Sequence, residues 1–412
     1  MPTFSIPLSG LTASSIALST IANNLANLNT IGYKDSRVLF RDLFYQSLGT
    51  NGAGDAIQQG AGTAVSSIPA SFTQGSVDPS GVATDVAILG DGFFVVTKNG
   101  VVSYTRAGNF EVDKNSLLVT SDGQMVMGYP AVNGVLNPGQ GLTSLALGAG
   151  TISPATATAN VQLRTNLDAT AAVGTVYSAP VTIYDSLGAS HVLMFTYTKT
   201  ATNAWDYSIS IPAADVGGAV DPTVLQTGSL TFDGNGNLTS PASDVAGINI
   251  TGFVDGANDL TFTWKLYDPN NAGFLTQMAS PSSTSSTQQD GAGSGTLVKF
   301  EIGSDGTITG AFSNGKTAIL GQLALATFAN NQGLLRTGNN GFSETLASGQ
   351  PVIGGPGTSG RGTLAGGALE LSNVDIAKEF AALIVAQRGF QANARAVTTF
   401  DEITQETINL KR

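Results

Sequence analysis

Few residues of this chain have types and spacings that could support catalysis. The segment from Asp185 to His191 brings an Asp, two Ser residues and a His close together, which invites comparison with a Ser-His-Asp hydrolase. Triad members come from separated elements, however, and this segment has no Gly-x-Ser-x-Gly nucleophile elbow. We therefore expect a hairpin with His191 packed on a sheet. Because this is the single His and the chain has no Cys, a metal site built on these residue types is not expected.

A second candidate is the run Asp233-Gly234-Asn235-Gly236-Asn237, which resembles the start of a calcium-binding loop with Asp244 at its twelfth position. Its sixth position is Leu238, where such a loop needs a Gly for its sharp turn. The flanking segments are β-type, so the run predicts a hairpin turn. No Gly-rich segment has the spacing of a phosphate-binding loop. The sequence therefore predicts no catalytic residue, no bound cofactor and no metal ligand, and hence no enzyme.

The composition of the 412-residue chain limits the classes of partner that can be expected. Only 11% of the residues are charged and the net charge is −11, so the basic stripe of a nucleic-acid-binding protein is missing. No run of about 18 apolar residues stands out, and we expect no membrane insertion. The N-terminus lacks the basic start of a secretory signal. An extracellular carbohydrate-binding or hydrolytic β-protein is an alternative, although aromatic residues make up only 7%.

The chain reads as mostly β-structure between two terminal helices. Turn dipeptides such as Asp91-Gly92 separate β-rich runs, and low-complexity segments at about 131–160 and 280–295 bracket a second β-rich region. We expect nested, discontinuous β-domains inserted between N- and C-terminal helices that form a coiled coil. The predicted parts are a helical domain (1–33 plus 369–412), an extended arm (34–71), an inner β-domain (72–145 plus 290–368) and an outer inserted β-domain (146–289).

Both terminal helices, predicted at about 8–30 and from a Ser372 cap to about 410, carry apolar residues at coiled-coil spacing. Helices without a globular body beneath them are marginal in water. We therefore expect them to pair with each other or with neighbouring copies. The predicted self-assembly residues are Leu11, Leu18, Ile21, Leu25 and Leu28 in the first helix, and Ile376, Phe380, Leu383, Phe390 and Val397 in the last.

Two long segments carry a resemblance to a known family. The segment Ile21-Ala22-Asn23-Asn24-Leu25 through Gly32-Tyr33-Lys34 resembles the N-terminal signature of bacterial flagellar rod and hook proteins. The segment from Leu369-Glu370-Leu371 to Asn393 resembles their C-terminal signature. The middle of the chain, including Tyr184-Asp185-Ser186-Leu187-Gly188, is similar to the hook branch of this family, and rod proteins tend to be shorter.

The resemblance implies a structural subunit that self-assembles into the short curved tube linking the rod to the filament and transmitting torque. The alternative is a distal rod protein of the basal body. The implied partners are copies of the chain itself, the distal rod, the hook cap, the hook–filament junction proteins and the type III export apparatus. The implied location is extracellular, in the flagellar hook. Phe4 and Leu8 resemble the apolar pair of an export-gate motif.

Overall fold

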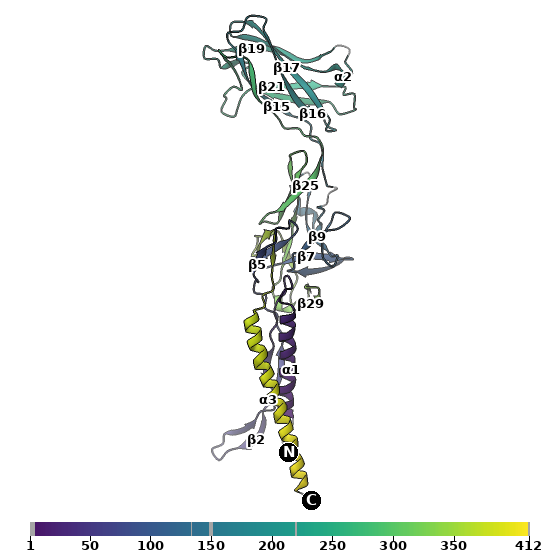
Figure 1. Cartoon of the computed structure of the whole chain (residues 1–412), viewed down its shortest axis with the longest axis vertical. Coiled ribbons are helices and arrows are strands. Elements are labelled where there is room, and N and C mark those ends of the chain that lie inside the picture. The colour runs from purple at the N-terminus through teal and green to yellow at the C-terminus, as the bar shows by residue number, and fades with distance from the viewer. Residues whose placement is uncertain (1–4, 133, 148–150, 219–220, 411–412) are drawn as a thin grey trace. The chain divides into compact units, whose positions relative to one another are not determined.

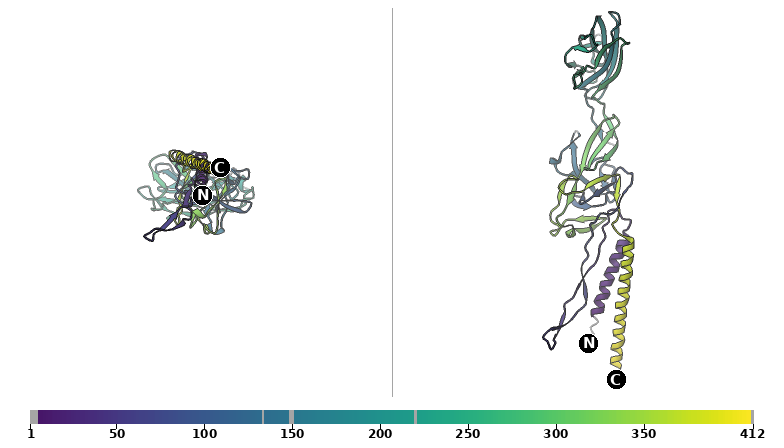
Figure 2. Two further views of the ribbon diagram at one scale, coloured as in Figure 1. Left: turned by 90° about the horizontal axis from the view of Figure 1, so that it is seen from below. Right: turned by 90° about the vertical axis from the view of Figure 1, so that its left-hand side faces the viewer.

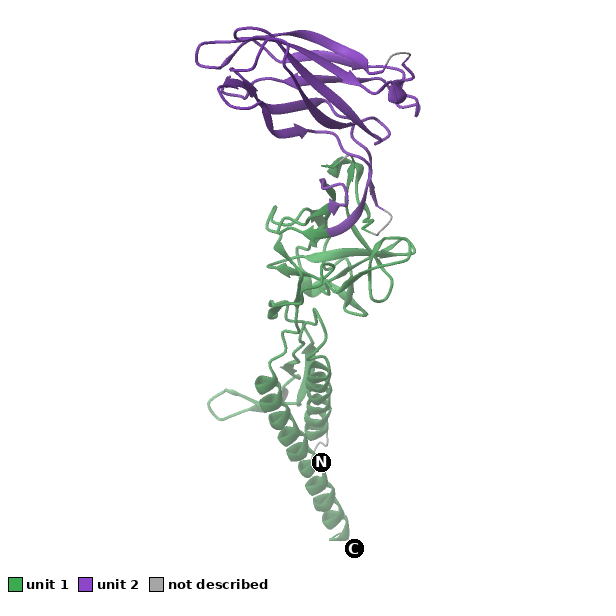
Figure 3. Cartoon of the chain, turned by 45° about the horizontal axis from the view of Figure 1, so that its top comes forward, with its two compact units in different colours: residues 1–148, 300–310, 318–412 green, residues 149–299, 311–317 purple. Residues whose placement is uncertain are grey.

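The computed structural model describes residues 5–132, 134–147, 151–218 and 221–410, and the chain divides into two compact units (Figure 3). Unit 1 comprises residues 1–148, 300–310 and 318–412, and unit 2 comprises residues 149–299 and 311–317. The two long helices both belong to unit 1, and β-strands dominate everything between them (Figure 1). This confirms the predicted fold class. The expected division of unit 1 into helical, arm and inner β parts stays a prediction.

The helices of unit 1 are α1 (Ser5–Ala26) and α3 (Ile376–Asn409). Helix α1 starts earlier than expected because Pro7 lies in its first turn, where a missing N–H breaks no helical bond. The chain leaves the helix after Ala26 through turns that end at Gly32, whose φ of +67° suits a residue without a side chain.

The cap of α3 is Asp375, and the expectation of Ser372 was wrong. The backbone at Asp375 is extended, so its carboxylate reaches back to accept the N–H groups of Ala377 at 2.8 Å and of Lys378 at 3.1 Å. The Ser372 hydroxyl instead accepts the N–H of Val374.

The strands of unit 1 are short and come from both ends of the chain. They are β1 (Leu39–Asp42), β2 (Gln46–Thr50), β3 (Ala56–Gln59), β4 (Thr63–Ser67), β5 (Val77–Pro79), β6 (Val86–Leu89), β7 (Phe93–Lys98), β8 (Val101–Thr105), β9 (Phe110–Val112), β10 (Leu118–Thr120), β11 (Met125–Val132), β12 (Val135–Leu136), β13 (Thr143–Ser144), β28 (Leu325–Thr327), β29 (Leu335–Gly338), β30 (Gly341–Ser343), β31 (Val352–Gly354), β32 (Thr363–Gly366) and β33 (Ala368–Glu370). Strands β25 (Gly295–Ile302), β26 (Thr307–Phe312) and β27 (Thr317–Leu323) contain residues of both units.

Strand β7 organises the core of unit 1. It lies within the antiparallel order β27–β11–β7–β8–β30–β29, and its residues are buried on both faces of the sheet. Phe94 and Val96 pack into one apolar cluster, whereas Phe93 and Val95 pack into another. An unbroken apolar run is what a strand with two covered faces requires.

Two small strand pairs close unit 1 across a large sequence separation. Strand β5 pairs with β33, and β6 pairs with β32, both antiparallel. Since β33 leads directly into α3, this pairing holds the beginning of the last helix beside segments that follow the first one. The nested arrangement therefore rests on backbone ladders between the two ends of the chain.

Residues 34–71 form a long two-stranded ribbon, visible in Figure 2. Strand β1 pairs with β4, and β2 pairs with β3, so the turn lies between β2 and β3. The ribbon has little core of its own, as its composition predicts: Phe44 is 92% exposed, and Tyr45, Leu48 and Ile57 are also exposed.

Unit 2 is a sandwich of two sheets. One sheet contains β16 (Val176–Tyr184), β17 (Ser190–Ala201), β18 (Ala204–Ile211), β19 (Thr223–Phe232) and β20 (Leu238–Ser240) in that order. The other contains β15 (Asn160–Asp168), β21 (Val245–Ile250), β22 (Leu260–Lys265), β23 (Leu275–Met278) and β24 (Ser283–Gln289). A short helix, α2 (Ala213–Val216), and strand β14 (Ile152–Ser153) complete the unit.

Aromatic side chains from both sheets fill the core of unit 2. The ring centroids of Phe195 and Tyr207 lie 5.2 Å and 5.1 Å from that of Trp264. Trp205 belongs to the same buried cluster. The alternation of buried and exposed residues along β17 follows the pleat of a strand with one covered face.

The Asp233 turn confirms the hairpin prediction. Its carboxylate accepts the N–H groups of Asn235 and Asn237, at 2.9 Å and 2.8 Å, and the run connects β19 to β20. Asp244, the other acid of the supposed calcium loop, is instead paired with Lys265 at 2.9 Å.

Neighbouring residues of β17 offer a test of this packing. Leu193→Ala removes a fully buried side chain and should lower the free energy of unfolding of unit 2 by about 2–5 kcal/mol. Val192→Ala, at a side chain that is 42% exposed, should cost less than about 1 kcal/mol. Urea titration followed by tryptophan fluorescence measures both, because both Trp residues lie in unit 2. Equal losses would mean that the register of β17 is misassigned.

Candidate assembly surface on the terminal helices

A buried ion cluster holds the bases of the two terminal helices. The Glu370 carboxylate, at the end of β33, lies 2.7 Å from Nζ of Lys34 and 3.1 Å from Nε of Arg106. All three side chains are buried. Glu370 also accepts the N–H of Gly75 at 2.9 Å, and Lys34 donates to the carbonyl of Thr73 at 2.7 Å. One carboxylate thus connects the segment after α1, the loop after β8 and the strand before α3.

The cluster holds two cations and one anion away from water. Burial lowers the pKa of Lys34, the adjacent Arg106 lowers it further, and Glu370 opposes both effects. Burial likewise lowers the pKa of Arg106, with Glu370 again acting in the opposite direction. The Arg106 guanidinium also has backbone partners: its Nη1 donates to the carbonyls of Gly90 and Gly92, each at 2.8 Å. Glu370 is therefore the main charge that offsets the burial of the two cations, with smaller contributions from Asp35 on Lys34 and from Asp91 on Arg106.

A polar network continues from the cluster to the helices. Asn24, buried on α1, donates to the carbonyl of Ser36 at 2.7 Å and accepts the Tyr33 hydroxyl at 3.1 Å. Asn373, just before α3, accepts the N–H of Asp35 at 2.7 Å. The segment between Tyr33 and Ser36 is thereby fixed to both helices, which sets where each helix begins or ends.

The two helices lie side by side and antiparallel (Figure 2). Gly10 of α1 faces Asn393 of α3, and Ser14 lies beside Gly389. A Cβ atom placed on Gly10 would come within 2.8 Å of the Asn393 side chain. Small residues therefore occupy the centre of the contact and allow the backbones to approach closely, so the larger apolar residues lie at its edges.

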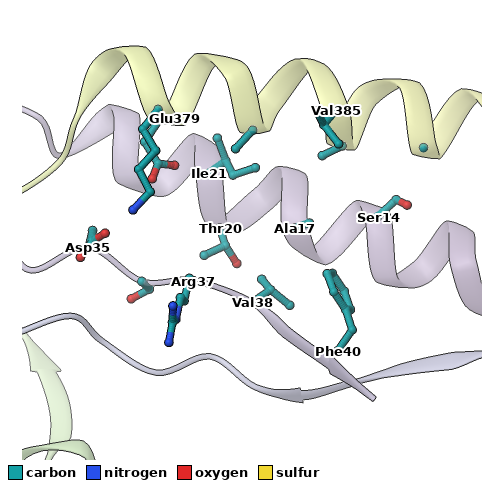
Figure 4. Close-up of a pocket in the computed structure, with 15 residues that line it drawn as sticks. Ser14, Ala17, Thr20, Ile21, Asp35, Arg37, Val38, Phe40, Glu379 and Val385 are labelled. Atoms are coloured by element: carbon teal, nitrogen blue, oxygen red, sulfur yellow. The ribbon is translucent and has the colours of Figure 1, made fainter. Parts of the chain in front are cut away.

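A groove of about 570 Å³ follows one side of the helix pair (Figure 4). Figure 4 shows residues of α1, α3 and the start of the ribbon converging on it. Its apolar lining includes Ala17, Ile21, Val38, Phe40 and Val385. The ribbon thus covers part of one side of the helix pair and leaves the groove open.

The predicted assembly residues mostly lie at the edges of the helix contact. Leu28 follows α1 in a turn and is half-buried, and Ile21 lines the groove. Ile376 and Phe380 are exposed. The remaining predicted residues are half-buried: Leu11, Leu18 and Leu25 on α1, and Leu383, Phe390 and Val397 on α3. At 3.6 residues per turn in antiparallel helices, both groups fall on the same side of the pair, opposite the groove.

Further exposed apolar residues of α3 were not among those predicted from the heptad pattern. Ile384 is 57% exposed on α3, one turn beyond Phe380, and Val385, Ile403 and Ile408 are exposed as well. A seven-residue repeat selects one row of a helix, whereas rows four residues apart, such as Ile376–Phe380–Ile384, drift around it. The sequence analysis did not predict the ion cluster either. Lys34, Arg106 and Glu370 are far apart in the sequence and form no motif, and their only signal is that charged residues are rare in this chain.

Of the two residues predicted to form an export-gate motif, the structure describes one. Leu8 is 56% exposed on α1, and Phe4 lies outside the described residues.

By length and composition, α1 could cross a membrane, which the sequence analysis did not expect. The helix contains no Asp, Glu, Lys or Arg, so its Leu, Ile and Ala residues dominate. In the structure α1 packs along α3 and β4. Length and composition do not distinguish a membrane-spanning helix from one that packs against protein.

Known families match both terminal helices and much of the β-structure between them. Residues 6–34 match the flagella basal body rod protein family, and residues 365–410 match the flagellar basal body rod FlgEFG protein C-terminal family. Residues 87–167 match the flagellar hook protein FlgE/F/G D1 domain, and residues 151–292 match the flagellar basal body protein FlaE D2 domain. Terminal helices around nested β-domains of these kinds define the class of flagellar axial proteins.

Full-length relatives narrow the class. The flagellar hook protein FlgE of Escherichia coli K12 is 35% identical, covering 99% of this chain and 100% of the relative. The corresponding protein of Salmonella typhimurium LT2 is 36% identical over the same shares, and that of Borreliella burgdorferi is 35% identical over 98% of each chain. This chain belongs to the flagellar hook protein family, which places it in the flagellum.

A solved structure also aligns. The crystal structure of Helicobacter pylori flagellar hook protein FlgE2 gives a TM-score of 0.49 at 16% identity, over 71% of this chain and 100% of that one. This overlap is too loose to support a further conclusion.

The ion cluster can be tested by removing its anion. Glu370→Gln keeps the side-chain shape but leaves two buried cations together, and it should lower the free energy of unfolding of unit 1 by about 3–5 kcal/mol. Far-UV circular dichroism in urea follows unit 1, while tryptophan fluorescence follows unit 2 and should not change. The matched control is Glu111→Gln, at an exposed residue of β9, which should cost less than about 0.5 kcal/mol. Equal effects of the two variants would contradict the role given to Glu370.

Proposed function

We propose that this protein is the structural subunit of the flagellar hook, polymerising with copies of itself into a curved hollow tube that links rod to filament and transmits torque. The observation that carries the proposal is an apolar strip along the side of the helix pair opposite the groove. The strip is formed by the half-buried predicted residues of both helices together with Ile376, Phe380 and Ile384. Its exposed part includes Ile376, Phe380 and Ile384, at 47%, 51% and 57% exposure. A single chain offers nothing among its described residues to cover these side chains.

The energetics favour covering this strip. Full burial of an Ile or Phe side chain stabilises by about 1.5–3 kcal/mol. Among the described residues, no sheet packs over this strip, and most of the stability of a helix in a protein comes from the packing of its apolar face. Contact between neighbouring copies would therefore stabilise the helices and the polymer together.

The proposed role divides labour between the parts of the chain. The terminal helices would form the inner, twist-resistant layer because their apolar surface is buried continuously in the polymer. The β-domains would form outer layers that exchange polar contacts as the tube bends. A charged content of only 11% suits such exchange, since charged pairs depend on geometry and salt.

The family polymerises into the hook and associates with basal-body components. For this chain we propose the distal rod, the hook cap, the hook–filament junction proteins and the type III export apparatus as partners, and an extracellular location in the hook. The role requires no catalysis. Full-length similarity to hook proteins supports it over the distal rod alternative, and electron microscopy separates the two, since a rod protein would build straight assemblies.

Polar substitutions on the exposed strip should weaken polymerisation without unfolding the monomer. For the double variant Phe380→Gln with Ile384→Gln, we expect at least a ~10-fold rise in the protein concentration needed for polymer, because each copy loses two buried apolar contacts. Sedimentation and negative-stain microscopy after salting out measure this. The control is Thr399→Ser, a polar exchange at an exposed position of α3 away from the row of Phe380 and Ile384. Assembly of the double variant at the wild-type concentration would contradict the assignment.

Removal of the inserted sandwich should spare polymerisation and change curvature. Thr156 and Ala292 exchange two backbone hydrogen bonds of 2.8 Å, so the chain segments that lead into and out of the sandwich are directly paired. Replacing residues 157–291 with Asn-Gly would close them as a two-residue hairpin. Electron microscopy should show tubes whose curvature differs from that of the wild type. Complete loss of polymer would mean that assembly does not depend on the helices alone.

A further inference from the structure

Three loops meet at one end of unit 2 and bring four chemistry-bearing residues together. Asp185 begins the turn between β16 and β17, and His191 is the second residue of β17. Asp215 lies in α2, and Asp255 lies in the loop between β21 and β22. The structure therefore assembles around the single His of the chain a group that the sequence disperses over 70 residues.

The loops are fixed to one another by contacts outside the group itself. The N–H of Asn258 donates to the Ser186 hydroxyl at 3.0 Å, which connects the Asp255 loop to the Asp185 turn. The N–H of Val254 donates to the carbonyl of Asp215 at 3.0 Å. The ring of Phe253 packs against the His191 ring, with centroids 4.7 Å apart. The convergence is thus part of the folded framework of unit 2.

One carboxylate oxygen of Asp185 is reserved for this site. Asp185 is fully buried, and its Oδ1 accepts the N–H groups of Leu187 and Ala189, each at 2.9 Å. Its Oδ2 is hydrogen-bonded to Nε2 of His191 at 3.1 Å. One ligand atom each from Asp185, His191 and Asp255 lies within 4.8 Å of the others. Asp255 is exposed, so its side chain has room to adjust.

The group has more negative charge than its surroundings balance. Within the described part of the chain, no Lys or Arg forms an ion pair with Asp185, Asp215 or Asp255. On the other side of the imidazole, Oδ2 of Asp215 lies 3.2 Å from Nδ1, although off the line of a hydrogen bond. His191 is only 7% exposed, so its ring nitrogens face carboxylates instead of water.

We propose that Asp185, His191 and Asp255 bind a divalent transition-metal ion of the Zn²⁺ type. Nε2 of His191 hydrogen-bonds to Asp185 in the ion-free chain, and the tautomer with its proton on Nδ1 frees the Nε2 lone pair for a cation that lies between the two other carboxylates and removes their repulsion. The 3.1 Å separation of Nε2 and Oδ2 matches adjacent ligands at about 2.1 Å from one metal, which lie about 3.0–3.4 Å apart. Asp215 is a positioning residue, in the manner of carboxylates that orient metal-bound His rings.

The donor set selects the ion. Imidazole nitrogen suits Zn²⁺, Ni²⁺ and Cu²⁺, whereas Ca²⁺ and Mg²⁺ prefer oxygen ligands alone. Three protein ligands leave further positions for water. Because the ligands come from the β16–β17 hairpin and from the loop between β21 and β22, the ion would connect these two segments and stabilise the sandwich.

Equilibrium dialysis of the full chain against Zn²⁺, with Ca²⁺ in parallel, tests the proposal. We expect one Zn²⁺ per chain and a higher thermal midpoint of unit 2, read by the fluorescence of its two Trp residues. Asp255→Asn should weaken binding by more than ~10-fold, and Asp215→Asn by about 10–100-fold. Asp206→Asn, which removes an exposed charge from β18 of the same unit, should bind as the wild type does.

Retention of one Zn²⁺ by Asp206→Asn and its loss from Asp255→Asn would support the site. Because Asp255 is exposed, that variant should fold even if His191→Gln does not. The absence of saturable Zn²⁺ binding would show that a proton on His191 satisfies the carboxylates and would overturn the proposal. Equal binding by Asp255→Asn and Asp206→Asn, or binding of Ca²⁺ in preference to Zn²⁺, would overturn it as well.

Discussion

A single buried carboxylate connects the parts of unit 1. Glu370 pairs with both Lys34 and Arg106, which come from distant segments, and each of the three side chains would be costly to bury alone. Because β33 ends at Glu370 and α3 begins a few residues later, this contact also determines where the last helix emerges. The close approach of the two helices depends on where α3 begins, because Gly10 and Ser14 of α1 lie opposite Asn393 and Gly389 of α3 only in this alignment of the two helices.

The helix pair shows how one packing choice creates another surface. Gly10, Ser14 and Gly389 occupy the middle of the contact, so the backbones come close but little apolar area is buried there. The large apolar residues are left at the edges and on the outside. A chain whose helices satisfied themselves fully would offer nothing to a neighbour. The apolar strip is therefore a direct consequence of small residues at the centre of the pair.

Unit 2 follows a different logic. Its two sheets bury their aromatic residues against each other, and its first and last segments pair with each other at Thr156 and Ala292. A unit that closes its own core can be carried by the chain without contributing to the helix contact. That independence also allows its loops to hold a group such as His191 and its three carboxylates, whose charges would disturb an apolar interface.

The fold class, the terminal helices, the turn at Asp233 and the family could all be predicted from the order of the residues, because periodicity, turn dipeptides and signature residues are local properties. Caps were less secure, since Ser372 and Asp375 offer the same chemistry and backbone geometry decided between them. Only the tertiary structure could show which helix residues face a partner, because a heptad row does not reveal the neighbour's position. The tertiary structure also brings Lys34 close to Glu370 and His191 close to Asp255, and such contacts between distant segments leave no local pattern in the sequence.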